Sequence, residues 1–398
     1  MLETRLREAS NGFADAVVNF CQRLIRTPSP PGEEGRIAAL VAGEMRRLGY
    51  DAVETDAAGN VIGQIRGSGG RSLMLNTHLD HVDVGDPERW ASPPFDGAIV
   101  DGAIWGRGAM DIKGPLACQV YAPAVLRAAG IVPPGDLYVT ATVMEEVGGI
   151  GAQLLARELA PDLAVVGEAS RCQVARGHRG RVEIEVRFTG RGGHASMPRE
   201  LANPHYAAAR LLAAVEGLEM VDSDGLGPAT VSPTLYRSDQ SSRNVTPEQV
   251  LLVLDWRTVP DEGPEQVLGR VARLAEAACG EGISVEVGIP QTAWRTYTGL
   301  AHPMPAIFPA FELPETQVLV QAAREALETI YNEAVPVRVW RFATDGGHFM
   351  AAGIPTVGFG PGDDRLAHTT EERIGLVELA RGLLGNAALC ARLGEVAI

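Results

Sequence analysis

The sequence predicts an α/β protein in two domains, and three features of its hydrophobic pattern support that expectation. Between residue 15 and about residue 175, helical segments alternate with short apolar runs such as RSLMLNTH and DLYVTATVME, which suit buried strands of a mostly parallel sheet. After Gly177 the strands alternate polar and apolar residues, as in VEIEVRF, which is typical of antiparallel pairing. The final third returns to the first pattern. We therefore expect a discontinuous domain of residues 1–177 and 295–398, interrupted by an insert of residues 178–294.

The individual elements follow from periodicity. The N-terminal stretch spaces Phe13, Val17, Phe20 and Leu24 along one face of an amphipathic helix. In the insert, the order strand, helix, strand, strand, helix, strand indicates a smaller α+β, ferredoxin-like unit. The stretch TAWRTYTGLAHPMPAIFPAFELP has poor periodicity, so we expect it to cross back irregularly to the first domain. A helix in ETQVLVQAAREALETIY, a strand in IPTVGFG and a helix near VELARGLLGNAALCARL complete the chain.

Composition excludes several classes of protein. The 398 residues carry a formal net charge of −15 without a cluster of Lys and Arg, which argues against nucleic-acid binding. No window approaches the ~20 uninterrupted apolar residues of a membrane span, and the N-terminal stretch lacks a signal-peptide pattern. We therefore expect no membrane partner and a cytoplasmic location. The five cysteines are scattered, which favours reduced thiols over disulfides or a thiolate zinc site.

Two residues with metal-site chemistry close an apolar run. His78 and Asp80 end LMLNTHLD, and strand ends of an α/β sheet open onto its ligand-binding crevice. Residues two apart share a face of a strand, so Asp80 can hold one nitrogen of His78 while the other nitrogen binds a metal. The alternative interpretation is a buried histidine that a neighbouring aspartate simply satisfies.

Further acidic residues recur at similar places. Asp111 follows the glycines of GRGAM, where it could cap the next helix or bridge two cations. Glu145 and Glu146 end the strand LYVTATVMEE, where adjacent acids require charge compensation, and one can bind metal while the other stays free as a base. The residues of zinc-ligand type at or past predicted strand ends are His78, Asp111, Glu146, Glu168 and His368.

Six motifs carry a resemblance to a known enzyme family. THLD, GRGAMDIKG, VMEEVGGIGA, VVGE, RGGHASMP and GIPTVGFGPG, the last followed by AH, span nearly the whole chain. In the order and spacing of these motifs, the chain resembles the aminoacylase, acetylornithine deacetylase, succinyl-diaminopimelate desuccinylase and carboxypeptidase G family. This resemblance implies a di-zinc aminopeptidase-like catalytic domain. Six ordered matches are far more specific than one motif. CQVARGHRGRVEIEV and AWRTYTGLAHPMPAIFPAFEL further resemble a bacterial branch described as selenium-metabolism-linked hydrolases.

The resemblance implies a ligand set for the metal site. It implies that Asp111 bridges two zinc ions. One ion would also bind His78 and Glu168, and the other would bind Glu146 and His368. Cobalt or manganese can satisfy similar ligands, so the metal in the cell stays open.

The resemblance also implies the reaction. Glu145 matches the family's general base, and Asp80 matches the acid that orients the first histidine ligand. The implied activity is hydrolysis of an amide by a metal-activated water that loses its proton to Glu145. We expect an N-acyl amino acid as substrate, in a reaction of the deacetylase or desuccinylase type. A dipeptidase, a carboxypeptidase or an N-carbamoyl amino acid hydrolase on the same metal core is the alternative, and a non-catalytic metal-binding protein is a more remote one.

The insert resembles the family's lid, which commonly makes the dimer contact, so we expect a homodimer. His194 in GRGGHASMP matches a residue that reaches the neighbouring active site and stabilises the oxyanion, with an exposed loop histidine as the alternative. Asn244 and Arg257 match lid positions that hold the substrate's polar end or carboxylate, although Arg257 could be an ordinary strand-face arginine. Gly346 in ATDGGHF matches the substrate-carboxylate loop more loosely. Such a lid favours a carboxylate-bearing substrate over the free α-amine that an aminopeptidase binds.

Overall fold

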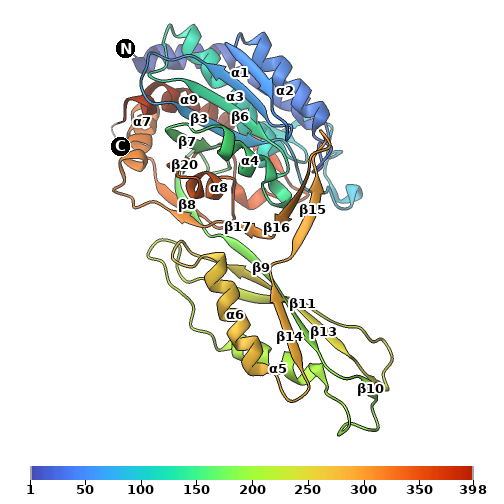
Figure 1. The fold of residues 1–398 in the computed structure, drawn as a ribbon. Coiled ribbons are helices and arrows are strands. Elements are labelled where there is room, and N and C mark those ends of the chain that lie inside the picture. Colours follow the sequence, from blue (N-terminus) through green and yellow to red (C-terminus); the bar gives the residue numbers. More distant parts are fainter. Residues whose placement is uncertain (1, 397–398) are drawn as a thin grey trace.

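The chain forms two bodies of unequal size, and the predicted α/β class is confirmed (Figure 1). A computed structural model describes residues 2–396. The larger body is built on one sheet covered by helices, and the smaller α+β body projects from it. No helix within the described residues is long and apolar enough to cross a bilayer.

The larger body contains a mixed sheet with a parallel centre. Its path is β1 (Ala52–Thr55), β2 (Val61–Ile65), β6 (Leu137–Thr142), β3 (Leu73–His78), β7 (Leu163–Val166), β20 (Thr356–Gly358), β8 (Val174–His178) and β18 (Phe311–Glu312), with β19 (Val337–Trp340) beside β8. The neighbours β6, β3, β7 and β20 run parallel, whereas β1, β2 and β18 pair in antiparallel fashion. The carboxyl ends of the central strands therefore meet at one edge.

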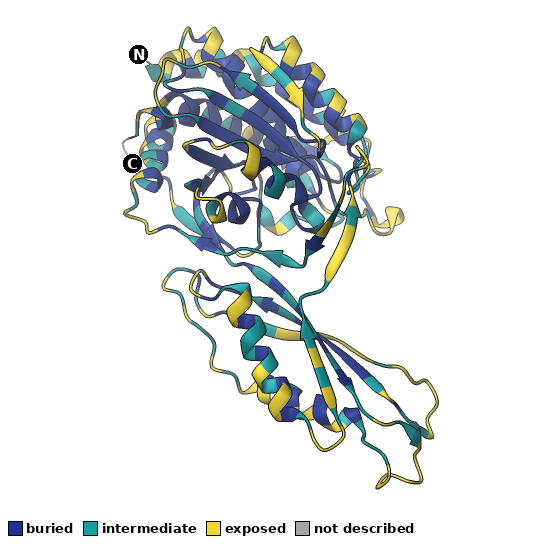
Figure 2. Cartoon of the chain, in the orientation of Figure 1, coloured by how far each residue is buried: buried dark blue, intermediate teal, exposed yellow. Residues whose placement is uncertain are grey.

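Helices cover both faces of this sheet. One face carries α1 (Leu2–Ile25), α2 (Gly35–Arg47), α3 (Gly114–Ala128), α7 (Val318–Tyr331) and α9 (Leu376–Arg392), and the other carries α4 (Ile150–Glu158) and α8 (Gly346–Ala351). Alternate residues of β3 serve the two cores, because Leu73 and Leu75 pack in one hydrophobic cluster and Met74 packs in the other. The central strands are buried throughout, as Figure 2 shows.

The smaller body has the strand order of a ferredoxin-like fold. Its elements are β9 (Arg181–Thr189), α5 (Pro204–Glu216), β11 (Thr230–Ser238), β13 (Gln249–Arg257), α6 (Pro264–Ala278) and β14 (Ser284–Gly288). The antiparallel order is β11-β13-β9-β14, with β17 (Ile307–Phe308) beside the start of β9. Alternate residues of β9, among them Ile184 and Val186, pack in one cluster with residues of both helices. A short pair of strands, β10 (Gly193–His194) and β12 (Val245–Thr246), lies at the far end of this body (Figure 1).

One segment has more strands than the sequence pattern predicts, and one small sheet is not predicted from the sequence at all. The stretch expected to cross back irregularly contains β15 (Gln291–Arg295), β16 (Ala301–Pro305), β17 and β18. β15 and β16 form a hairpin on their own, and exposed hairpin residues carry no apolar periodicity to detect. A small sheet of β4 (Ile99–Val100), β5 (Ala103–Trp105) and β21 (Arg373–Gly375) lies in the larger body, with strands too short to predict.

Candidate metal centre

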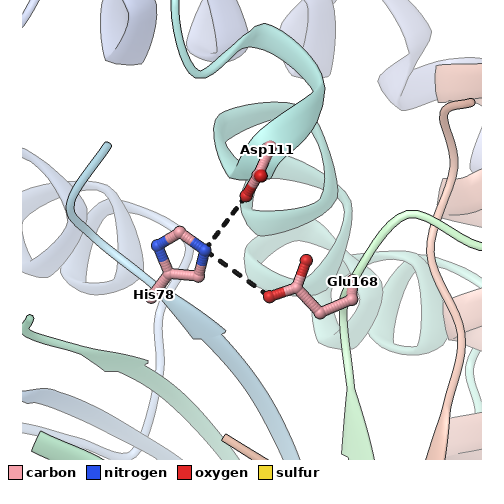
Figure 3. Close-up of side chains that lie close together, drawn as sticks. All are labelled: His78, Asp111 and Glu168. Carbon is pink, nitrogen blue, oxygen red and sulfur yellow. Dashed lines mark hydrogen bonds and ion pairs between the residues drawn. The ribbon is translucent and has the colours of Figure 1, made fainter. Parts of the chain in front are cut away.

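Three predicted ligands converge where parallel strands end. His78 is the last residue of β3, and Glu168 follows β7, its parallel neighbour. Asp111 lies in the segment η2 (Ala109–Lys113) that leads into α3. Figure 3 shows the side chains of Asp111 and Glu168 pointing at one nitrogen of the His78 ring. His78 Nε2 lies 3.2 Å from Asp111 Oδ1 and 3.5 Å from Glu168 Oε1.

A second group of three shares Asp111 with the first. His368 Nε2 lies 3.2 Å from Asp111 Oδ2 and 3.2 Å from Glu146 Oε2. The two oxygens of Asp111 therefore face two different histidines. Within each group, one potential ligand atom of every residue lies within 4.8 Å of the others. One carboxylate shared by two three-residue groups has the geometry of a bridging ligand.

The buried carboxylates of this cluster carry negative charge that bound cations would compensate. Burial raises the pKa of Glu168 to about 7, and burial also raises the pKa of Glu146. One oxygen of Glu146, Oε1, is buried without a hydrogen-bond partner among the described residues. A buried, unpartnered carboxylate oxygen is costly unless something compensates it. The donor set of two imidazoles and three carboxylates therefore fits a pair of metal cations.

Asp111 does not cap α3, which was the alternative interpretation from the sequence. The residue before α3 is Lys113, and the carboxylate of Asp111 instead faces the two histidines. Its backbone is held by a residue that sequence reasoning missed: Glu372 Oε1 accepts from the Met110 amide at 3.2 Å and from the Asp111 amide at 3.1 Å. Glu372 Oε2 in turn accepts from Arg107 at 2.6 Å. The buried pair of Arg107 and Glu372 thus fixes the backbone that carries the Asp111 carboxylate.

Asp80 connects the histidine to the paired glutamates. His78 Nδ1 lies 3.1 Å from the backbone carbonyl oxygen of Asp80 and 3.3 Å from its Oδ1, a geometry that suits a residue orienting the ring. The two carboxylate oxygens of Asp80 also accept from the backbone amides of Glu145 (3.0 Å) and Glu146 (3.1 Å). The expectation that the two glutamates end a strand is wrong, because β6 ends at Thr142 and Glu145 opens the 3-10 turn η3 (Glu145–Val147). Side-chain bonds to the backbone, and not a strand ladder, fix this turn.

Glu145 lines a cavity beside the cluster without belonging to either group of ligands. The cavity has a volume of about 230 Å³, and its apolar wall includes Met110, Phe342 and Ala367. Asp364 also lines it but is paired with Arg338, with Oδ2 and Nη2 2.8 Å apart. Burial raises the pKa of Glu145 well above its usual value. The candidate ligands Asp111, Glu146, Glu168 and His368 line the same cavity, so a small reacting group bound there would meet both the ligands and the Glu145 carboxyl.

None of the predicted lid residues, His194, Asn244 and Arg257, lines the cavity. His194 is exposed in β10, at the far end of the smaller body. Asn244 is exposed close to it, because its carbonyl accepts from the Ala195 amide. Arg257 ends β13, and its Nε bonds the neighbouring Asp255 at 2.6 Å. Within one chain, these three side chains do not complete the site.

Gly346 is also separate from the cavity. It begins α8, is buried, and donates its amide to Thr344 Oγ1 at 3.0 Å. Its Cα faces the ring of Phe311, since an added Cβ would lie 3.0 Å from Phe311 Cε1. Ala343 and Phe342, just before it, line the cavity instead.

Removal of bound metal is expected to lower the melting temperature. Chelation would leave the buried carboxylates uncompensated. An ion present at about 1,000 times its Kd adds about 4 kcal/mol to the stability of the folded protein, and for a chain of this length its loss lowers the melting temperature by roughly 5 °C. Differential scanning calorimetry with and without EDTA measures this. The Asp111→Ala variant is the control and should show no response to chelator. An unchanged melting temperature in protein proven metal-free by elemental analysis would contradict the assignment.

Comparison with known proteins identifies the family. The model of "Peptidase family M20/M25/M40" matches residues 74–390. The chain belongs to this family. The predicted resemblance, which names members of the same family, is thereby confirmed, and the protein is a metal-dependent hydrolase of amide bonds.

Three curated relatives and one solved structure illustrate the family's range. The chain is 31% identical over 376 residues to the uncharacterized protein YgeY of Escherichia coli, with 92% of each chain covered. It is 29% identical to an N-formyl-4-amino-5-aminomethyl-2-methylpyrimidine deformylase of Bacillus subtilis, covering 92% of this chain and 91% of the relative. It is 31% identical to a succinyl-diaminopimelate desuccinylase of Paracoccus denitrificans, covering 67% and 73% respectively. The fold resembles that of aminopeptidase PepT from Bacillus cereus, with a TM-score of 0.76 at 20% identity over 95% of this chain and 98% of the other.

Proposed function

We propose that this family member hydrolyses N-acyl amino acids with two zinc ions. The observation that carries the proposal is the carboxylate of Asp111, which lies between His78 and His368 with the spare carboxyl of Glu145 beside it. His78 and Glu168 would hold one ion, and Glu146 and His368 the other. Bound zinc would polarise the scissile carbonyl and acidify a water molecule.

The chain's own residues would carry the proton transfers. Glu145 lies in the cavity wall outside both ligand groups, so its carboxylate is free to accept a proton and later to donate it to the leaving amine. Asp80 holds the amides of Glu145 and Glu146 and also faces His78 Nδ1. Asp80 thus orients the ring of His78 directly. It orients Glu145 and Glu146 through the backbone amides of these two residues.

We further propose that the working site is shared by two chains. β11 is one of the two edge strands of its sheet and exposes Leu235 and Tyr236, with Tyr206 of α5 exposed in the same body. A second copy that covers this surface could bring its His194 to the cavity. The Nδ1 atom of His194 accepts from the Ser196 amide at 3.2 Å, so the proton of a neutral ring lies on Nε2 and can be donated to an oxyanion.

The partner's lid could also hold the substrate. Asn244 lies close to His194 because β12, which it precedes, pairs with β10. A partner chain that brings His194 to the cavity would therefore bring Asn244 as well. Arg257 would bind a substrate carboxylate only by exchanging its bond with Asp255. These residues make an N-acyl amino acid the favoured substrate over a free peptide amine.

The His194→Ala variant is expected to lose about 10²- to 10³-fold in kcat while its metal content stays the same, because one oxyanion donor is removed. Steady-state kinetics and elemental analysis measure both quantities. His302→Ala, a histidine of β16, is the control and should retain full activity. Equal kcat in the two variants would contradict the role of His194.

A mixing experiment tests whether His194 acts across the dimer. A chain with His194→Ala and a chain with Glu145→Gln should each be inactive, yet a mixed dimer would contain one intact composite site. After subunit exchange at equal concentrations, activity is expected to return to about one quarter of the wild-type value. Absence of recovery in a sample shown to contain mixed dimers would contradict a site shared between chains.

The substrate class is tested by measuring amine release from a panel of N-acetyl, N-succinyl, N-formyl and N-carbamoyl amino acids and dipeptides. We expect turnover of N-acyl amino acids above turnover of dipeptides. Turnover of dipeptides alone would identify a peptidase and overturn the proposed specificity.

A further inference from the structure

The turn that carries Glu145 and Glu146 is held by an unusual set of side-chain acceptors. Four successive backbone amides, from Val143 to Glu146, each donate to a side chain from elsewhere in the chain. Val143 donates to Asn60 Oδ1 at 3.0 Å, and Met144 donates to Glu34 Oε1 at 3.2 Å. The next two amides donate to the two oxygens of Asp80, as described above. We call Asn60, Glu34 and Asp80 the amide cradle.

The backbone of this turn needs external support. Met144 has φ 58° and ψ 39°, a left-handed conformation that is unfavourable for a residue with a Cβ. The parallel ladder between β3 and β6 ends where His78 pairs with Thr142, so no strand neighbour takes up the following amides. Successive amides around a left-handed residue form a concave site for anionic oxygens. Here the oxygens belong to the protein's own side chains.

Glu34 and Asn60 are themselves fixed. Both are fully buried. Asn60 Nδ2 donates to Asp56 Oδ2 at 2.7 Å and to the Gly151 carbonyl at 3.0 Å, which turns its oxygen toward Val143. Glu34 Oε1 also accepts from the Gly32 amide at 3.0 Å. Neither residue lines the cavity or belongs to a ligand group.

We propose that Glu34 and Asn60 are positioning residues for the reaction. Glu34 acts through the amide of Met144, and Asn60 acts through the amide of Val143. Together they orient the two side chains that follow, the base Glu145 and the metal ligand Glu146. The proposal rests on the proposed function for the role of Glu145. Its consequence for Glu146 is a property of metal binding and can be measured without turnover.

The test compares Glu34→Leu with Glu34→Gln in the metal-loaded, full-length protein. Leucine fills the volume but accepts no hydrogen bond, so kcat is expected to fall about 10- to 100-fold with KM within about threefold of the wild-type value. Glutamine keeps an oxygen acceptor and should restore kcat to within about threefold. Cobalt loading supplies the spectroscopic readout: Glu34→Leu should alter the visible absorption of bound Co²⁺ and weaken one of two binding steps.

The matched control is Glu44→Leu. Glu44 is also buried and lies in the last turn of α2, the helix that Glu34 precedes. Its hydrogen bonds go to Arg23, Arg47 and Tyr121, and none goes to a residue of the cradle. This control should lower the melting temperature and leave kcat and the cobalt spectrum unchanged. If Glu34→Leu does not fold, Asn60→Ala gives the same comparison with the same expected result.

Two results would overturn the proposal. One is a Glu34→Leu or Asn60→Ala protein that loses stability but keeps kcat and the cobalt spectrum, as Glu44→Leu should. The other is a Glu34→Gln protein as impaired as Glu34→Leu. Retained activity in Glu145→Gln would instead refute the proposed function. The effect of the cradle on the cobalt spectrum would still be testable in that case, because it does not depend on turnover.

Discussion

Replacing Glu145 with glutamine is expected to lower kcat by about 10²- to 10⁴-fold while both metal ions stay bound. Glutamine has nearly the same shape and cannot accept the proton. Glu145 belongs to neither group of ligands, and its backbone amide, not its side chain, bonds Asp80. The substitution therefore removes proton transfer and spares the architecture around it.

The neighbouring residue provides the control for this experiment. Glu146→Gln changes the same chemical group one position along the chain, but Glu146 Oε2 faces His368 in a ligand group. It is expected to lower kcat together with metal content. Initial rates and elemental analysis on both variants separate the two roles. Activity near the wild-type level in Glu145→Gln would refute the base assignment.

Replacing Asp111 with alanine is expected to abolish binding of both ions at micromolar metal and to lower kcat by about 10³-fold or more. Its two oxygens face two histidines, so one substitution damages both groups. The magnitude follows from losing several kcal/mol of electrostatic stabilisation in the transition state, at 1.36 kcal/mol for each factor of ten.

Glu168→Ala is the comparison for Asp111→Ala. Glu168 belongs to one group only, so this variant should retain one ion per chain. Isothermal titration of metal-free protein counts the binding steps in each variant. Two tight steps in Asp111→Ala would show that the carboxylate does not bridge.

Much of the fold was predictable because burial leaves a clear pattern. The central strands are buried on both faces, and their near-continuous apolar runs distinguish them from the alternating strands of the smaller body. The hairpin of β15 and β16 was missed because its residues are mostly exposed, so packing imposes no pattern on them. The end of β6 was misplaced for a different reason: the apolar run continues through Met144, whose buried side chain belongs to a left-handed turn.

The candidate site was only partly predictable. His78 and Glu168 follow adjacent parallel strands, so topology alone brings them together. The support of Asp111 by Glu372 could not be foreseen, because it joins residues far apart in the chain through backbone amides that carry no sequence signature. The support that Glu34 and Asn60 give to the amides of Met144 and Val143 could not be foreseen for the same reason. The roles of the lid residues rest on family resemblance alone, because β10 and its His194 lie at the far end of the smaller body and do not line the cavity of their own chain.

The requirement for two metal ions is tested most directly by titrating the metal-free protein with zinc and measuring amine release from an N-acyl amino acid that the panel identifies as a substrate. We expect no activity without metal and maximal activity at two ions per chain. A chain that binds two ions and hydrolyses no member of the panel would contradict the proposed reaction, as would full activity in protein proven to be metal-free.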